Sequence, residues 1–181
     1  MEFQPLWLEG ACIIQPNVFY DDRGYFMVPY QAKAFAEHGL PTNWVQDNQS
    51  LSTRRGVLRG FHFQMPPHTE AKLVRVLDGV IMDVIVDLRK DSPTFGQWDS
   101  VELSAENQKM VYIPRGFAHA FCVVSDRALV TYKVDNDYAP KAQAGLIWND
   151  PTLNIPWPVD DPLLSEKDSQ LPTLAEFESP F

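Results

Sequence analysis

The sequence has few cysteines, no excess of positive charge and no long apolar run. Its only cysteines, Cys12 and Cys122, stand in apolar stretches and form no Cys-x-x-Cys pair, so a zinc ribbon is excluded and two buried free thiols are expected. The net charge of −9 argues against a general nucleic-acid binder, which neutralises phosphates. No apolar run reaches the roughly 20 residues of a membrane span, and "MEFQPLWLEG" does not resemble a signal peptide. These absences favour a cytoplasmic protein with neither nucleic-acid nor membrane partners.

The composition is that of a globular protein with a core of its own. Of the 181 residues, 45% are hydrophobic and 22% charged, and no repeat, low-complexity tract or linker interrupts them. A chain of this length is typical of one domain. We therefore expect residues 1–181 to form a single domain.

Most of the chain reads as short strands. "KLVRVLDGVIMDVIVDLR" contains two β-branched runs that break at Asp78–Gly79, which predicts a β-hairpin there. In the second run Asp83 and Asp87 alternate with the apolar positions, on the face opposite Val84. Further strands are expected in "QWDSVELS", "KMVYIPRG", "HAFCVVSD" and "ALVTYKVDN". Strands of this spacing favour an all-β sandwich or barrel.

Helical signals are scarce. Only residues 32–40, "AKAFAEHGL", combine Ala-rich propensity with a terminating Gly39 ahead of Pro41. His38 is expected to cap the C-terminal end of this helix, and His68 to lie in a loop. The proline-rich stretch after residue 150 predicts an irregular C-terminal tail with one helical turn near "SEKD".

Two spaced motifs resemble those of the cupins, which are double-sheet jelly rolls. A cupin's first motif places Gly, His-x-His, Glu and Gly at set intervals, and its second contains Pro-x-Gly-x-x-His. This chain matches the frame at Gly56, His62, Gly79, Pro114, Gly116 and His119. Gln64 and Lys72 stand where the frame has a metal-binding His and Glu. The fold expected is therefore an all-β, cupin-type double-sheet jelly roll with few short helices.

The altered frame suits proton transfer better than metal binding. Two imidazoles and an amide are a poor ligand set for a divalent ion, and the cation of Lys72 would repel it. His62 is a base that works near neutral pH, and Lys72 can stabilise negative charge on a carbonyl oxygen. Together they suit removal of a proton next to a ketone, with Tyr132 as candidate acid. A carboxylate should orient the base, and spacing leaves Asp83, Asp87 and Asp168 as alternatives.

For several other polar residues, composition alone does not decide between a role in the site and simple exposure to solvent. Arg59 is three residues before His62, so it faces away in a regular strand, although a bulge at Gly60 could redirect it. Arg23 stands in a turn, "DDRG". Gln46, Asp47 and Asn48 follow one another and are equally compatible with a solvated turn.

Longer segments resemble one family, the dTDP-4-dehydrorhamnose 3,5-epimerases. They include "QDNQSLSTRRGVLRGFHFQ", "KLVRVLDG", "DVIVDLRKDSPTFGQW", "IPRGFAHAF", "YKVDNDYAP", "WNDPTLNIPWP" and "LLSEKD". The resemblance runs in order from about Ile13 to Asp168.

The resemblance implies a metal-free, cofactor-independent isomerase. Such an enzyme epimerises dTDP-4-dehydro-6-deoxy-D-glucose at carbons 3 and 5 to dTDP-4-dehydro-L-rhamnose, for L-rhamnose biosynthesis. It implies that His62 is the base, Tyr132 the acid, Asp168 the carboxylate paired with the base, and Lys72 the group that stabilises the enolate. It also implies substrate contacts, at Arg23, Phe26, Gln46, Asp47, Asn48, Arg59, His119, Tyr138, Gln143 and Lys167. The family is a homodimer whose N-terminal segment reaches the partner's site, so Arg23 and Phe26 are expected to serve the other subunit.

The chain departs from the family pattern on the nucleotide side. Val28 and Gln143 stand where the family usually has glutamates, and Gln49 stands where His is common. Rival hypotheses are a single-centre epimerase on a related nucleotide sugar, a cupin that binds sugars without turnover, and a metal-dependent cupin enzyme.

Overall fold

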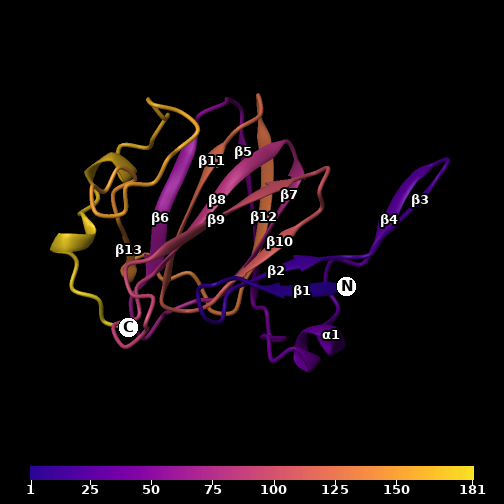
Figure 1. The fold of residues 1–181 in the computed structure, drawn as a ribbon, viewed down its shortest axis with the longest axis horizontal. Helices are drawn as coiled ribbons and strands as arrows, with labels where there is room; N and C mark the ends of the chain where they lie inside the picture. Colours follow the sequence, from indigo (N-terminus) through magenta and orange to yellow (C-terminus); the bar gives the residue numbers. More distant parts are fainter.

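The computed structural model describes residues 1–181 as two antiparallel sheets that face each other, with a small projecting hairpin (Figure 1). In spatial order, the first sheet contains β1 (Glu2–Pro5), β2 (Cys12–Gln15), β10 (Met110–Ile113), β7 (Lys72–Asp78), β12 (Ala128–Val134) and β5 (Gln46–Ser52). The second contains β13 (Gln143–Gly145), β6 (Leu58–Gln64), β11 (Phe117–Val123), β8 (Val80–Asp87) and β9 (Trp98–Ser104). The hairpin is β3 (Val18–Asp21) with β4 (Gly24–Met27). The all-β double-sheet prediction is confirmed.

The main core lies between the two sheets. It takes Val74 and Val76 from β7, Ile81 and Ile85 from β8, and residues from β9 to β12. A second cluster covers the other face of the second sheet, where the C-terminal tail packs Trp157, Phe177 and Phe181 against it. Strands β8 and β11 are therefore buried on both faces, which is why their sequences are almost continuously apolar.

The predicted hairpin at Asp78–Gly79 is wrong. β7 pairs with β10 and β12, whereas β8 pairs with β11 and β9, so the turn joins one sheet to the other. Gly79 has a positive φ of 83°, and a Cβ there would lie 2.0 Å from the Arg127 carbonyl oxygen. A turn signal specifies only that the chain reverses. Which strands then pair is decided by burial of the apolar faces of Val76 and Ile81 between the sheets.

The only α-helix, α1 (Ala32–Glu37), is shorter than the predicted range 32–40. His38 caps it as expected, and its Nδ1 lies 2.8 Å from the Ala34 carbonyl. Gly39 takes the left-handed conformation that ends the helix, with φ 70°. Phe35 anchors the helix in a third apolar cluster under the first sheet.

The C-terminal tail is irregular, as predicted, with 3-10 turns η1 (Asp168–Gln170) and η2 (Leu174–Glu176). The helical turn expected near "SEKD" is η1, and it places Asp168 against β6. Cys12 and Cys122 are buried free thiols, as predicted. The structure contains no helix both long and apolar enough to cross a membrane.

Candidate active site

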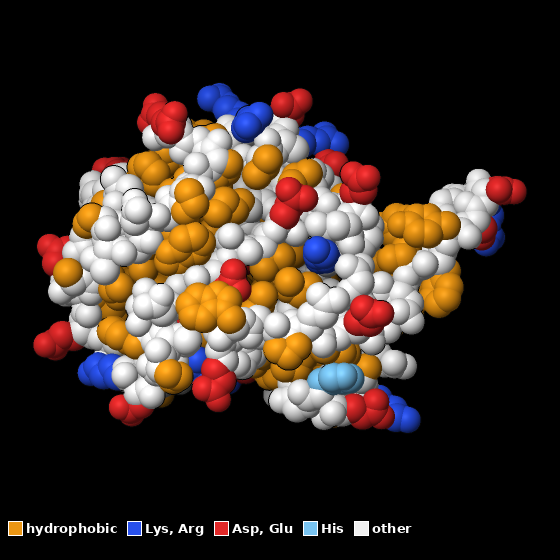
Figure 2. All heavy atoms as spheres, viewed as in Figure 1, with side chains coloured by type: hydrophobic (Ala, Val, Ile, Leu, Met, Phe, Trp, Pro, Cys, Tyr) orange, Lys and Arg blue, Asp and Glu red, His pale blue; other side chains and the backbone are white.

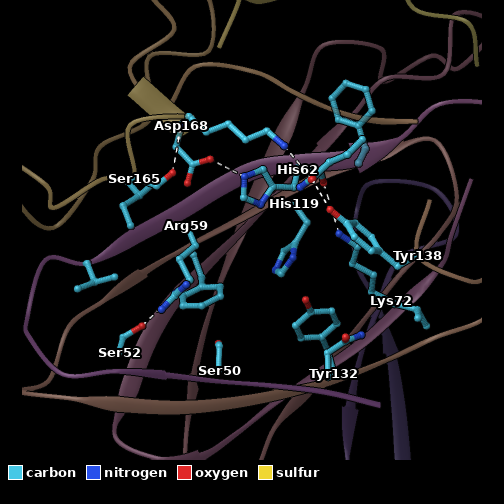
Figure 3. Close-up of a pocket in the computed structure, with 18 of the residues that line it drawn as sticks. Ser50, Ser52, Arg59, His62, Lys72, His119, Tyr132, Tyr138, Ser165 and Asp168 are labelled. Atoms are coloured by element: carbon cyan, nitrogen blue, oxygen red, sulfur yellow. Dashed lines mark hydrogen bonds and ion pairs between the residues drawn. The ribbon is translucent and has the colours of Figure 1, made fainter. Parts of the chain in front are cut away.

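A cavity of about 740 Å³ opens between the two sheets. Polar side chains enter it from β5, β7 and β12 of the first sheet, from β6 and β11 of the second, and from the tail (Figure 3). A site between sheets has side chains on opposing walls, so one ligand can be contacted from two sides.

His62 on β6 is held by a buried carboxylate. Its Nε2 lies 2.6 Å from Asp168 Oδ1, and Asp168 is only 3% exposed. Burial raises the pKa of Asp168, but the hydrogen bond and charge of His62, with hydrogen bonds from Ser165 and Gly60, outweigh it and lower the pKa. Because this carboxylate accepts from Nε2–H, the neutral imidazole has its lone pair on Nδ1. The structure therefore selects Asp168 from the three candidate carboxylates and makes Nδ1 the basic atom.

Tyr132 on β12 approaches the cavity from the other sheet. Figure 3 shows its hydroxyl and the His62 ring entering the cavity from opposite sides. Burial and then the negative charge of Glu70 raise the pKa of Tyr132, against the opposing effect of Arg59. The phenol therefore stays protonated at neutral pH, as a proton donor must.

Lys72 and His119 supply the polar groups near the base. Lys72 is 7% exposed, and its Nζ lies 3.3 Å from Glu70 Oε1 and 3.4 Å from the His62 carbonyl oxygen. His119 Nε2 lies 2.7 Å from Asp83 Oδ2, so a second buried His–Asp pair faces the cavity. The Lys72 ammonium is suited to stabilise an oxygen that becomes negative, whereas His119 can donate to it only as an imidazolium, because its Nε2–H is engaged by Asp83.

Arg59 and His62 both line the cavity despite their odd spacing. His62 pairs with His119, while Arg59 pairs with Phe121, so β6 has one residue more than β11 between these pairs. This is the bulge anticipated at Gly60, and it turns Arg59 inward. The Arg59 guanidinium donates to Ser52 Oγ at 3.2 Å.

Alternation along β5 separates residues that were predicted as a group. Gln46, Asn48 and Ser50 line the cavity, whereas Asp47 points to the other face and pairs with Lys133 Nζ at 2.8 Å. Asp47 is therefore not part of the cavity lining in this structure, because neighbouring side chains of a strand point to opposite faces, and its expected substrate contact stays a prediction.

Three residues at the rim form one hydrogen-bonded group. Gln143 Oε1 accepts from the Tyr138 hydroxyl and from Lys167 Nζ, both at 2.8 Å. The glutamine thus fills the role of an acceptor at this position, with one negative charge fewer than a glutamate.

Arg23 and Phe26 lie far from this cavity, on the β3–β4 hairpin. The hairpin projects from the body, and Figure 2 shows apolar side chains gathered along it. Phe19, Tyr20 and Phe26 are 63%, 72% and 66% exposed. Arg23 pairs with Asp21 at the tip. These two predicted site residues are therefore not brought to the cavity of their own chain.

Of the predicted site residues, the cavity unites all but Arg23, Phe26 and Asp47. It is lined by Gln46, Asn48, Arg59, His62, Lys72, His119, Tyr132, Tyr138, Gln143, Lys167 and Asp168. The sequence interpretation missed Glu70 and Ser50 and did not pair Asp83 with His119. Ser50 could have been found from its period-two spacing with Gln46 and Asn48, and its buried Oγ has no partner.

No group of three or more His, Cys, Asp or Glu side chains is placed to share a metal ion. Lys72 occupies the position where the cupin frame has a carboxylate, and its ammonium lines the cavity.

Comparison with known proteins identifies the family. The family model described as dTDP-4-dehydrorhamnose 3,5-epimerase matches residues 5–176. The chain belongs to this family. It is 52% identical over 162 residues to the dTDP-4-dehydrorhamnose 3,5-epimerase of Shigella flexneri, covering 89% of each chain.

Solved structures of a dTDP-4-dehydrorhamnose 3,5-epimerase and of a dTDP-6-deoxy-D-glucose-3,5-epimerase have the same fold. The Bacillus anthracis enzyme, crystallised with TDP and PPi, has a TM-score of 0.94 and 46% identity and covers 96% of this chain and 99% of its own. The Legionella pneumophila enzyme, in complex with dTDP-4-keto-L-rhamnose, has a TM-score of 0.93 and 41% identity over 98% and 94% of the two chains. The family also contains a dTDP-4-dehydrorhamnose 3-epimerase from Streptomyces niveus, 41% identical over 97% of this chain and 85% of its own.

Proposed function

We propose that this protein epimerises dTDP-4-dehydro-6-deoxy-D-glucose at carbons 3 and 5, producing dTDP-4-dehydro-L-rhamnose for L-rhamnose biosynthesis. The observation that carries the proposal is the placement of His62 and Tyr132 on opposite sides of one cavity. Inversion of a carbon requires a proton to leave one face and another to arrive at the opposite face. A base and an acid on opposing sheets provide that arrangement.

Each inversion then takes two proton transfers. His62 Nδ1 removes the proton from the carbon next to the 4-keto group, and the C–H electron pair moves to form an enolate. The Lys72 ammonium stabilises the negative oxygen, and His119 adds a second donor in its imidazolium form. Tyr132 protonates the carbon from the opposite face, the carbonyl re-forms, and solvent restores the proton balance. Asp168 orients the His62 ring and stabilises its protonated form.

The remaining cavity residues suit a nucleotide diphosphate sugar. Arg59 is placed to bind a phosphate oxygen through charge-assisted hydrogen bonds. Gln46, Asn48 and the group of Tyr138, Gln143 and Lys167 supply further polar contacts around the cavity. The Legionella relative was crystallised with a ligand of this class.

We further propose that the working unit is a homodimer. The aromatic β3–β4 hairpin is exposed in one chain. Its cation, Arg23, and its ring, Phe26, lie outside the cavity of that chain. Seated in the cavity of a second copy, Arg23 would bind the diphosphate and Phe26 would stack on the base. A single cupin-like domain over residues 1–181, a cytoplasmic location and catalysis without cofactor stay predictions.

The alternative is an epimerase that inverts only one carbon of a related 4-keto-6-deoxysugar. The 41% identical Streptomyces niveus relative, named as a 3-epimerase, favours keeping it. A single-centre enzyme needs the same base and acid, so the residues of the cavity do not separate the two functions.

Reaction in deuterated water separates them. Purified protein is incubated in D₂O with dTDP-4-keto-6-deoxyglucose and the downstream reductase with its reduced nicotinamide, and the product is read by NMR. Deuterium at carbons 3 and 5 with the L-rhamnose configuration is expected. Label and inversion at one carbon only would replace the proposal with the alternative. A reaction without protein measures spontaneous exchange.

A further inference from the structure

Gln64 is a buried side chain of β6 for which the proposed mechanism has no use. It is 3% exposed. Its Nε2 donates to Glu70 Oε2 at 2.9 Å, to the His68 carbonyl at 2.9 Å and to the Asp137 carbonyl at 3.2 Å. Its Oε1 accepts from the Ala139 N–H at 2.6 Å. Both amide N–H hydrogens are therefore engaged by protein acceptors, and through these contacts the residue can act on its neighbours.

One of those neighbours, Glu70, forms an ion pair with Lys72, the proposed enolate-stabilising group. The second oxygen of Glu70, Oε1, lies 3.3 Å from Lys72 Nζ. The Lys72 and Glu70 side chains are 9% and 11% exposed, so the ion pair is nearly dry. A buried ion pair is favourable only when its geometry is good and its remaining lone pairs are satisfied. Gln64 meets that need for Glu70.

The same carboxylate acts on the proposed acid. After burial, the negative charge of Glu70 is the largest contribution that raises the pKa of Tyr132. Tyr138 raises this pKa further, and Arg59 lowers it. The other titratable groups that line the cavity with Tyr132 come from several elements, namely Arg59 and His62 on β6, Glu70 before β7, Lys72 on β7, His119 on β11, Tyr138 after β12, and Lys167 and Asp168 in the tail.

We propose that Gln64 and Glu70 are positioning residues of this site: the Gln64 amide fixes the Glu70 carboxylate, which holds Lys72 at the developing enolate. The inference rests on the proposed function. A lysine has a long flexible stem, so without an anchor its ammonium would occupy many positions in a cavity of this size. In the cupin frame the positions of Gln64 and Lys72 bind a metal. Here Gln64 and Lys72 both contact the Glu70 carboxylate, which holds the Lys72 ammonium in place.

The first test is the isosteric change Glu70→Gln, which removes the charge while keeping an acceptor for Gln64. We expect kcat to fall about tenfold or more because the ammonium loses its position, with KM changed much less. The alkaline limb of the kcat–pH profile should move to lower pH, since Tyr132 loses the negative charge that opposes its ionisation. Glu166→Gln, the same charge removal on an exposed tail residue, is the control and should change neither quantity.

A double-mutant cycle then asks whether Gln64 acts through Glu70. Gln64→Met should lower kcat in the wild-type background and have little further effect when Glu70 is already Gln. A purely structural role, holding the loop of Asp137 and Ala139, would give equal effects in both backgrounds. Urea unfolding midpoints identify any variant that fails to fold, and the Glu70→Gln profile tests the proposal without Gln64→Met.

The outcomes separate this inference from the proposed function. A wild-type protein that inverts neither carbon overturns the function and, with it, the positioning role. A wild-type protein that epimerises while Glu70→Gln keeps its kcat and pH profile overturns the inference alone. Equal effects of Gln64→Met in both backgrounds overturn the part assigned to Gln64.

Discussion

In the proposed mechanism, His62 and Tyr132 divide each inversion between two side chains of different acidity. Asp168, whose pKa is lowered, hydrogen-bonds the His62 ring, and burial and then Glu70 raise the pKa of the Tyr132 phenol. Because the two tasks lie on different residues, they can be removed one at a time, and each removal leaves a different signature in the isotope exchange.

Removing the base should stop both proton abstraction and inversion. For His62→Asn we expect kcat to fall by about 10²–10⁴-fold, the usual contribution of a positioned general base. Deuterium uptake from solvent at carbons 3 and 5 should fall in parallel. NMR in D₂O measures both quantities. A variant that kept full turnover would refute the mechanism and revive a metal-dependent reaction, which added metal or chelator would reveal.

Removing the acid should separate exchange from inversion. In Tyr132→Phe, His62 can still remove the proton and return a solvent-derived one from its own side. We expect inversion to fall by about 10²–10⁴-fold, while deuterium uptake with retained configuration persists. The measurement is the ratio of label uptake to epimerised product. Equal loss of both would mean that Tyr132 is needed for proton abstraction as well.

At the scale of elements, the position of the base depends on how closely β6 approaches β11. Gly60 has a φ of 118°, and a Cβ there would lie 2.6 Å from the His119 carbonyl oxygen and 2.7 Å from Ala120 Cα. Only glycine permits this close approach of β6 to β11. The same segment contains the bulge that brings Arg59 and His62 to one cavity.

Gly60→Ala should therefore reduce stability and activity together. We expect the free energy of unfolding to fall by about 3 kcal/mol, from overpacking and backbone strain, with a larger relative loss of kcat because His62 shifts. Gly24→Ala is the matched control: Gly24 has a similar φ of 130° but nothing within 4 Å of its added Cβ. Urea unfolding of both variants separates crowding from φ strain. Equal destabilisation would contradict the close-approach argument.

At the scale of the whole molecule, acid stability depends on buried carboxylates. Asp87 is fully buried and accepts hydrogen bonds from Arg89, Ser92 and Thr94. Burial raises the pKa of Asp87, but these hydrogen bonds outweigh it and lower the pKa from 3.8. A lowered folded-state pKa means that the stabilisation is complete above 3.8 and is lost as pH falls through the lower, folded-state value.

Asp87→Asn should remove part of this acid dependence. Urea unfolding followed by tryptophan fluorescence between about pH 2 and 6 should give a shallower loss of stability below the ordinary Asp pKa. Near neutral pH the variant should be less stable by about 2–4 kcal/mol, because Arg89 loses its charged partner. An unchanged slope in acid would show that other carboxylates, Asp168 among them, account for it.

The proposed dimer predicts that two inactive variants recover activity when they are combined in mixed dimers. His62→Asn keeps an intact hairpin, and the double variant Arg23→Ala, Phe26→Ala keeps an intact cavity. Each should be nearly inactive alone. After the two are mixed and allowed to exchange subunits, about a quarter of the wild-type activity per site is expected, because half the dimers are mixed and each has one complete site. No recovery despite subunit exchange would show that the hairpin does not serve the partner.

Much of the site was accessible from the sequence because its chemistry is local to a few motifs. Spacing in "GVLRGFHFQ" and "IPRGFAHAF" placed His62 and His119 in one frame, and the apolar context of Tyr132 marked a polar exception. The choice among Asp83, Asp87 and Asp168 was not accessible from spacing. Asp168 is separated from His62 by 106 residues, and only packing of the tail against β6 joins them.

The other differences between the expectations and the structure have the same cause, namely contacts between segments that are distant in the sequence. The turn at Asp78–Gly79 was recognised, but its strands belong to different sheets. Asp47 was grouped with its neighbours, but β5 directs it to the opposite face. Glu70 carried no visible signal, since its importance lies in contacts with Lys72 and Gln64 on two different strands.

The sequence by itself determined the all-β class, the free thiols, the presence of Gln64 and Lys72 at two positions where the cupin frame binds metal, and the family. Residue type and spacing are sufficient for these four conclusions, because hydrophobic period, ligand chemistry and motif order are properties of the sequence alone. The tertiary structure alone decided which strands pair, which aspartate pairs with which histidine, and that His62 and Tyr132 face each other across the cavity. Those are relations between distant segments, and burial of two apolar sheet faces against each other, not any local preference, brings them into contact.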